Sequence, residues 1–224
     1  MKLHLASFLL LMLSLTLAAA PAGAVDIQLL YSNGPLDGYT NAWTINYGYS
    51  VYDSFTLSTS GTMTSFSFGV WVYPGDRPLT VDYQIWTNPQ SGTLLAAGTS
   101  NLIDAFQFNN GWPNGGYDIY ISTAATAPIS LLGGNTYWLR LLDATTVQGN
   151  PMFWDENSGI GCSSPGCPSQ AYDEYGGIFT SIASEDPDFF GYTTAGSTPE
   201  PGSILLFGSG VLVLAGVVRR KLGL

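Results

Sequence analysis

The chain has 224 residues, of which 13% are aromatic and only 10% charged, and its 16 acidic residues outnumber six Lys and Arg residues to give a formal charge of −10. Fifteen of the acidic residues but only two basic ones, Arg77 and Arg140, lie in residues 25–198, which contain no lysine or histidine. That segment lacks the cationic surface that a nucleic-acid partner or anionic lipid requires. It also lacks the base of Ser/His/Asp and Ser–Lys hydrolases and the imidazole of transition-metal sites.

The first 24 residues have the three parts of a secretory signal peptide. Lys2 supplies a short positive region, residues 3–17 are an apolar region, and Ala22-Gly23-Ala24 is a small-residue cleavage site. We therefore expect a signal helix, export of the chain, and cleavage by signal peptidase before Val25. An uncleaved membrane anchor is the alternative, which the helix-breaking Pro21 disfavours.

Residues 25–192 are predicted to form one β-domain, because apolar and polar residues alternate along them with period two. In residues 65–72, for example, Phe66, Phe68, Val70 and Val72 alternate with smaller or polar residues and with Trp71. This pattern is typical of strands with one face on a core. Strands are expected at 27–31, 49–57, 65–72, 79–86, 94–98, 102–108, 117–122, 137–142, 152–154 and 177–182. These short strands, separated by turns rich in Gly, Pro and Asn, predict an all-β, antiparallel, jelly-roll-like β-sandwich.

Tryptophans are the candidates for glycan binding, because sugars stack on exposed aromatic rings. Trp112 lies in a polar loop, Trp71 and Trp86 fall on the expected non-core faces of their strands, and Trp154 precedes an acidic stretch. Trp138 is flanked by apolar residues and is expected to pack. The alternative is that all these rings cover sheet edges or form a second hydrophobic layer.

Acidic residues suggest two further kinds of site. Glycoside hydrolases use two facing carboxylates, for which the candidates are Asp155, Glu156, Asp173 and Glu174, although adjacent acids on a strand point to opposite faces. Calcium prefers carboxylate and carbonyl oxygens, for which the candidates are Asp155, Glu156 and Asn157, or Glu185, Asp186 and Asp188. No loop has EF-hand spacing, and a solvated acidic surface is the simpler interpretation. The sequence thus assigns no catalytic residue and no cofactor, with calcium left open.

The two cysteines of the segment, Cys162 and Cys167, are separated by Ser-Ser-Pro-Gly. In an exported chain this pair predicts a local disulfide that closes a small loop. A metal site would need more Cys or His ligands, and a redox motif would have the C-x-x-C spacing.

The last 32 residues change character. Residues 193–198 are expected to form a linker, followed by Pro199-Glu200-Pro201, an uncharged apolar run at 202–218, and the basic residues Arg219, Arg220 and Lys221. The run would span roughly 25 Å as a helix, close to the thickness of a bilayer core. We expect a transmembrane helix that the basic residues stop on the cytoplasmic side, the alternative being a helix buried in a soluble core.

These three features in this order resemble the PEP-CTERM sorting signal. The resemblance implies recognition by a membrane-embedded exosortase, cleavage near Pro199-Glu200-Pro201, and delivery through the inner membrane to the cell surface or an extracellular polysaccharide matrix. Residence of the C-terminal helix in the membrane would then be transient or stable.

Residues 62–177 also resemble choice-of-anchor β-sandwich domains. The resemblance rests on Ile85-Trp86-Thr87, on Gly92-Thr93-Leu94-Leu95-Ala96-Ala97-Gly98, on Asn135-Thr136-Tyr137-Trp138-Leu139, and on Phe153-Trp154 followed by Asn157-Ser158-Gly159. It implies a fold and no catalytic residue. We expect a non-enzymatic surface or matrix protein, with a carbohydrate- or calcium-binding module as the alternative and a glycoside hydrolase as a third hypothesis.

Overall fold

The computed structural model describes residues 26–193, except 112–114, 158, 166 and 168. Twelve strands and no helix make up the secondary structure of these residues. The strands are β1 (Gln28–Ser32), β2 (Asn41–Thr44), β3 (Tyr49–Thr56), β4 (Gly61–Val72), β5 (Pro78–Trp86), β6 (Leu94–Asn109), β7 (Asp118–Leu131), β8 (Thr136–Thr146), β9 (Met152–Glu156), β10 (Ala171–Tyr175), β11 (Ile178–Ile182) and β12 (Asp188–Thr193). The predicted all-β class is confirmed.

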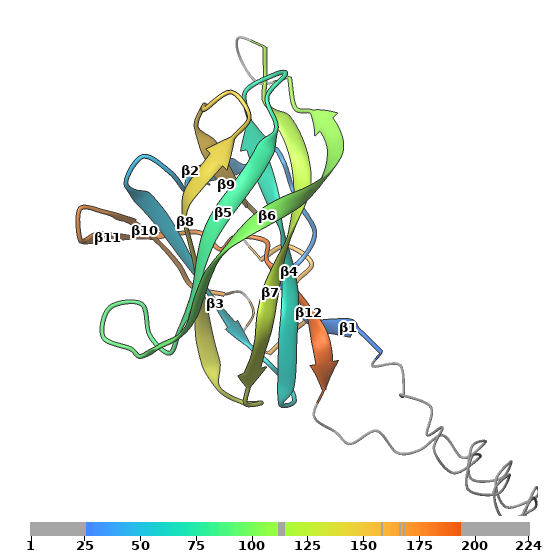
Figure 1. The fold of residues 1–224 in the computed structure, drawn as a ribbon, viewed down its shortest axis with the longest axis vertical. Helices are drawn as coiled ribbons and strands as arrows, with labels where there is room; N and C mark the ends of the chain where they lie inside the picture. The colour runs from blue at the N-terminus through green and yellow to red at the C-terminus, as the bar shows by residue number, and fades with distance from the viewer. Residues whose placement is uncertain (1–25, 112–114, 158, 166, 168, 194–224) are drawn as a thin grey trace, which may run out of the picture. The chain divides into compact units, whose positions relative to one another are not determined.

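Hydrogen bonds connect the strands into one curled antiparallel sheet (Figure 1). The strand order is β1-β12-β4-β7-β6-β5-β8-β3-β10-β11, and β9 pairs with β2 and β4 beside this path. Strand β6 has 16 residues; its first part pairs with β5 and its second part with β7. This long strand therefore joins the two halves of the sheet. The predicted jelly-roll-like sandwich is not confirmed by this pairing.

The two halves of the curled sheet face each other across one aromatic core. The rings of Phe55 on β3 and Phe189 on β12 stack with their centroids 4.0 Å apart. Phe66 on β4 meets Tyr83 on β5 edge-on at 5.6 Å. All four rings are buried, so strands that are well separated in the pairing order share the same apolar interior.

The predicted core faces agree with the structure at most positions. Phe66, Phe68, Val70 and Val72 are all buried. Alternation in residues 79–86 puts Leu79 on the same face as Val81, Tyr83 and Ile85 and so predicts that it faces the core. Leu79 is exposed, because bulges in the pairing of β5 with β8 break the alternation at the start of β5.

Strands β2, β10 and β12 have no counterpart among the predicted strands, and the expected strands at 94–98 and 102–108 are one strand, β6. In β12 the alternation is hidden by Gly191, which occupies a buried position between β1 and β4. A Cβ atom at Gly191 would lie 2.0 Å from the Thr62 carbonyl oxygen, so only glycine fits there. Strand β12 reaches Thr193, the first residue of the predicted linker.

The predicted signal helix (1–24) and transmembrane helix (202–218) lie outside the described residues. Within the described residues, the structure contains no helix long and apolar enough to cross a bilayer.

The shared core leads to a prediction about the free energy of unfolding. Replacing Phe189 with Ala removes a fully buried ring that contacts Tyr31, Phe55 and Phe66. We expect the free energy of unfolding, measured by urea denaturation, to fall by about 3–5 kcal/mol. Phe106→Ala removes a ring that is 56% exposed and is the matched control, with an expected loss below about 1 kcal/mol. Equal losses for the two variants would contradict a core shared between the halves.

Candidate functional site

Five carboxylates from distant parts of the chain gather inside the domain. They are Asp53 of β3, Asp155 and Glu156 of β9, and Glu185 and Asp186 just before β12, and we call them the acidic cluster. Their exposed fractions are 0%, 0%, 8%, 0% and 5%. An isolated antiparallel bridge pairs Glu156 with Glu185. Electrostatic repulsion from the other four acids acts on Glu185, which identifies it as the centre of the cluster.

Three tryptophans donate their indole N–H groups to this cluster. Trp71 Nε1 lies 2.5 Å from Asp155 Oδ1, Trp154 Nε1 lies 3.1 Å from Asp186 Oδ1, and Trp43 Nε1 lies 2.8 Å from Glu156 Oε2. Hydrogen bonds to an ionised acceptor are stronger than bonds between neutral groups. The tryptophans therefore help to hold negative charge inside the domain.

Asp186 fills a gap in the pairing of β4. Strand β12 pairs with β4 up to Ser67, and β9 begins to pair with it at Val70. Between them, the Gly69 N–H donates to both carboxylate oxygens of Asp186 at 2.9 Å. A Cβ atom at Gly69 would lie 2.5 Å from Asp186 Oδ2 and 2.8 Å from Asp155 Cβ, so glycine is required for this approach.

Asp155 holds the chain segment that covers this gap. Its two carboxylate oxygens accept the backbone N–H groups of Asp37 and Gly38, each at 2.9 Å. The segment between β1 and β2 therefore lies over the outer face of β4, where Leu36 approaches Gly69. This cover explains why Trp71, on the expected solvent side of β4, is only 1% exposed.

Asp53 and Asn33 form the other side of the cluster. Asp53 accepts hydrogen bonds from Ser169 Oγ at 2.7 Å, from the Ser54 N–H at 3.0 Å and from the Glu185 N–H. The Asn33 side-chain amide donates to Ser169 Oγ at 2.8 Å and to the Glu185 carbonyl oxygen. The backbone of Glu185 is thus well bonded, whereas neither of its side-chain oxygens has a hydrogen-bond partner among the described residues.

The predicted disulfide is confirmed and lies against this side of the cluster. Cys162 and Cys167 are bonded, with their Cα atoms 5.9 Å apart. Cys162 Sγ lies 3.1 Å from Asn33 Oδ1, and the Asn157 side-chain amide donates to the Asn33 carbonyl oxygen at 2.9 Å. The disulfide loop and Asn157 therefore fix the position of Asn33.

Burial is the main cause of the raised pKa values in the acidic cluster. It raises the pKa of Asp155 to about 6, and it raises the pKa of Asp53, Glu185 and Asp186 well above their ordinary values. Repulsion from the neighbouring acids adds to the pKa of Glu185 and Asp186. Hydrogen bonds from the backbone and from tryptophan oppose the shift of the pKa in Asp155 and Asp186 without cancelling it.

These raised pKa values predict that metal-free protein is more stable in mild acid than at neutral pH. Because the folded pKa of Asp155 lies above the unfolded value, the folded domain binds more protons between pH about 4 and 6, and stability falls as pH rises through that window. In a chelating buffer we expect the melting temperature to be about 5 °C or more lower at pH 7.5 than at pH 5. Asp155→Asn should flatten part of this slope. A melting temperature that rises from pH 5 to 7.5 would contradict the prediction.

The structure brings together four of the predicted calcium ligands, Asp155, Glu156, Glu185 and Asp186. Asp188 lies two residues beyond Asp186 and lines with it a cavity of about 40 Å³. The Asn157 side chain donates to the Asn33 carbonyl oxygen instead. Sequence reasoning missed Asp53, since its place beside Glu185 depends on the pairing of β3 and not on local spacing. Among the described residues, no three acidic, Cys or His side chains already surround a common point as a formed metal site.

Of the predicted glycan-binding tryptophans, Trp71 and Trp154 are 1% and 0% exposed, so the expectation that they offer a ring face to solvent is wrong. Both indoles are bonded to the acidic cluster instead. Trp112 lies outside the described residues. Trp138 is buried, as expected from its neighbours.

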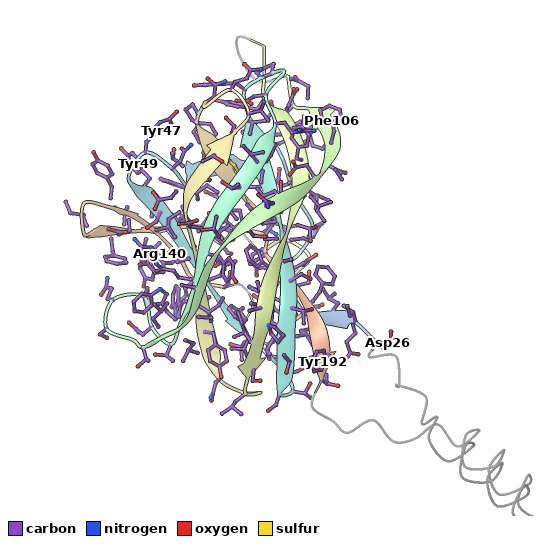
Figure 2. The ribbon with its side chains drawn as sticks, viewed as in Figure 1. Asp26, Tyr47, Tyr49, Phe106, Arg140 and Tyr192 are labelled. Atoms are coloured by element: carbon purple, nitrogen blue, oxygen red, sulfur yellow. A yellow bond between two sulfur atoms is a disulfide. The ribbon has the colours of Figure 1, made fainter. Side chains whose placement is uncertain are left out.

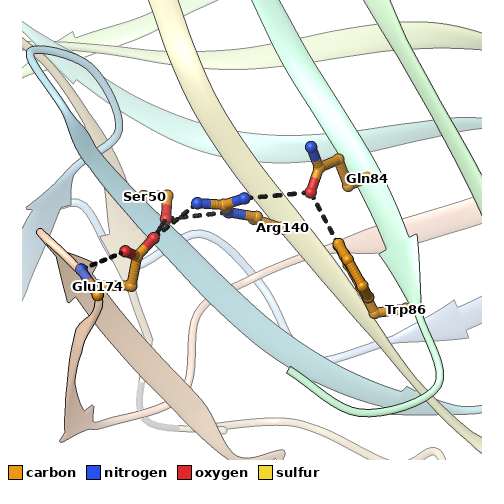
Figure 3. Close-up of polar contacts among 6 residues, drawn as sticks. Ser50, Gln84, Trp86, Arg140 and Glu174 are labelled. Carbon is orange, nitrogen blue, oxygen red and sulfur yellow. Dashed lines mark hydrogen bonds and ion pairs between the residues drawn. The ribbon is translucent and has the colours of Figure 1, made fainter. Parts of the chain in front are cut away.

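Trp86 is half-buried and belongs to a polar network on the outer face of the sheet (Figure 3). Its indole N–H donates to Gln84 Oε1 at 2.8 Å, and Arg140 Nη1 donates to the same oxygen at 3.2 Å. Arg140 forms an ion pair with Glu174 at 2.6 Å and donates to Ser50 Oγ at 3.0 Å. Burial raises the pKa of Glu174, but its hydrogen bonds and Arg140 outweigh burial, so the pKa is lowered. Arg140 is therefore engaged away from the acidic cluster.

An open groove of about 300 Å³ lies at the end of β3 and β8. Its lining includes Asn46, Tyr47, Asp143, Thr145 and Asn150. Tyr47 and Asp143, with φ of 55° and 46°, are the two described residues other than glycine that have a left-handed backbone. The Tyr47 ring is 61% exposed, and its hydroxyl donates to the Gly149 carbonyl oxygen across the groove.

A stacked pair of tyrosines extends the aromatic surface beside the groove. Figure 2 shows Tyr47 and Tyr49 on the same side of the domain, and the Tyr49 N–H donates to the Asn46 carbonyl oxygen. The Tyr49 and Tyr175 rings stack at 4.2 Å and are 36% and 52% exposed. No signal in the sequence distinguished these tyrosines from core aromatics.

A match to a protein-family model identifies the C-terminal segment. The model of the PEP-CTERM protein-sorting motif matches residues 197–221, the segment that includes Pro199-Glu200-Pro201 and the basic residues. This chain therefore carries a sorting signal that exosortases recognise, which implies an exported protein sorted to the cell envelope. No curated protein matches the chain. The resemblance to choice-of-anchor domains stays a prediction.

Proposed function

We propose that this chain is a non-enzymatic protein of the cell surface or extracellular matrix. The sorting motif at residues 197–221 is the observation that carries the proposal. In this proposal the signal peptide at 1–24 directs export and an exosortase recognises Pro199-Glu200-Pro201. The helix at 202–218 and the basic residues 219–221 hold the chain in the inner membrane until it is processed.

The arrangement of acidic groups in the domain supports a non-enzymatic role. Asp155 and Glu156 bind different tryptophans, and Glu174 is in an ion pair with Arg140. Asp173 and Glu174 are successive residues of β10 and point to opposite faces of the sheet. A glycosidase would instead direct two carboxylates at one bond from opposite sides of a sugar.

The facing halves of the curled sheet support a sandwich related to choice-of-anchor domains. The shared core between β3 and β12 is what a two-layer sandwich has, and the resembling segments supply β5, β6, β8 and β9 of this arrangement.

The sorting proposal is tested by replacing the one acid of the motif. Glu200→Gln removes the charge between Pro199 and Pro201 with little change in size, and we expect the amount of processed, surface-delivered protein to fall at least about tenfold. The measurement follows an epitope inserted after the signal peptide through membrane, surface and medium fractions. Glu174→Gln, which removes a carboxylate from the folded domain, is the matched control and should be processed as the natural chain is. Unchanged processing of Glu200→Gln would reject the proposal.

A second candidate function is carbohydrate recognition by the groove at the end of β3 and β8. It is favoured by the two left-handed residues, Tyr47 and Asp143, that line the same cavity, because backbone strain of this kind concentrates at functional sites. An exposed ring beside amide, hydroxyl and carboxylate groups suits a sugar, which stacks its apolar face and bonds through its hydroxyls. The volume is at the lower end of the range for small-molecule sites.

Tyr47→Asn tests this candidate, because asparagine tolerates the left-handed backbone while the ring is lost. On a glycan array and with polysaccharide extracted from the host, we expect the affinity of the protein to fall at least about tenfold. Tyr39→Asn is the matched control, since Tyr39 is equally exposed at 61% and lies away from the groove lining. Absence of glycan binding by the natural chain, or equal binding by Tyr47→Asn, would reject carbohydrate recognition at this site.

A further inference from the structure

Glu185 is the member of the acidic cluster whose carboxylate the described residues leave without a partner. Its side chain is 0% exposed, and no hydrogen bond reaches either Oε1 or Oε2. Asp53, Asp155 and Asp186 each accept at least two hydrogen bonds, and Glu156 Oε2 accepts bonds from both Trp43 and Asn41. A buried carboxylate in this state costs considerable free energy unless another group compensates it.

Protonation of Glu185 would remove its charge, and its O–H donor would then need an acceptor. The groups of the cluster that could accept it are the other carboxylates, whose repulsion acts on Glu185. A proton neutralises one of these carboxylates, whereas a divalent cation neutralises two. Neither of the two basic side chains in the described part of the chain compensates it. Arg140 is bonded to Glu174, and Arg77 acts on Asp104 and Tyr120.

Glu156 lies opposite Glu185 and can act with it as a pair of metal ligands. It is bridged directly to Glu185 between antiparallel segments. Residues in this relation project to the same face with their Cβ atoms about 4.5–5.5 Å apart, and like charges there repel. A divalent cation between the two carboxylates converts that repulsion into attraction. The 8% exposure of Glu156 gives such an ion access from solvent.

We propose that the domain binds Ca²⁺ between the carboxylates of Glu156 and Glu185. Calcium accepts six to eight oxygen ligands in flexible geometry, so two carboxylates with carbonyl, amide and water oxygens can hold it, whereas Mg²⁺ demands a near-ideal octahedron. A site with only two acidic ligands has the modest affinity of extracellular modules, on the order of 10⁻⁴–10⁻³ M. The ion would be acquired after export, when the domain meets a medium richer in calcium than the cytosol. The proposal is independent of the groove at Tyr47.

The experiment uses the full-length chain, solubilised in detergent, stripped with a chelator and returned to neutral buffer of constant ionic strength. Addition of CaCl₂ to about 5 mM should raise the melting temperature by about 2–4 °C, and MgCl₂ should raise it by less than half as much. Terbium(III) chloride provides a direct probe of the site. Trp43 Nε1 lies 2.8 Å from Glu156 Oε2, so the indole will sensitise the luminescence of a terbium ion bound to that carboxylate.

Glu185→Gln keeps the size of the side chain and removes its charge. We expect it to abolish both the calcium-dependent shift and the terbium signal, while its melting temperature in chelator is equal to or above that of the natural chain because repulsion is relieved. Glu156→Gln should weaken calcium binding at least about tenfold, which keeps the test decisive if Glu185→Gln fails to fold. Glu174→Gln, an acid of the outer face, is the control and should respond as the natural chain does.

Two results would overturn the proposal. One is a natural chain whose melting temperature does not respond to calcium beyond its response to magnesium. The other is a Glu185→Gln or Glu156→Gln variant that folds and binds calcium and terbium as the natural chain does.

Discussion

The domain depends on one constraint, the burial of five carboxylates that have no basic side chain beside them among residues 26–193 as far as the structure describes them. Asp186 replaces a missing strand partner at Gly69, and Asp155 fixes the covering segment through Asp37 and Gly38. Asp53 holds the backbone before β12 through Glu185. Each of these three acids therefore joins segments that are far apart in sequence, and N–H donors that only the folded chain brings together offset part of the desolvation of its charge.

This arrangement explains how much of the fold the sequence predicts. Alternation with period two places Phe66, Phe68, Val70 and Val72 correctly, because it depends only on the pleat of a single strand. It fails at Trp71 because it identifies the face on which a residue lies but not what covers that face. The cover comes from the segment between β1 and β2, held by an acid of β9, and this long-range contact leaves no trace in the alternation.

The same distinction separates the two kinds of functional signal in the chain. The sorting motif is predictable because its information is local: two prolines around an acid, an apolar run and three basic residues in fixed order. The acidic cluster is only partly predictable. Asp155, Glu156 and Asp186 stand out as acids, but Asp53 joins them, and Glu156 meets Glu185, only because β3, β9 and the segment before β12 converge. The residues of the groove come from separate parts of the chain, so the sequence did not predict that they lie together.

The buried acids of the domain also bear on the export that the sorting motif implies. A charge buried beside other like charges lowers stability until protons or a cation neutralise it, so the composition of the surrounding medium decides how stable the domain is. An apolar cluster of the same volume would give more stability in every compartment, and it would not respond to the medium. Under the calcium proposal, retaining acids in the interior suits a chain that is addressed out of the cytosol, because the ion that would stabilise the domain is available where the sorting signal delivers it.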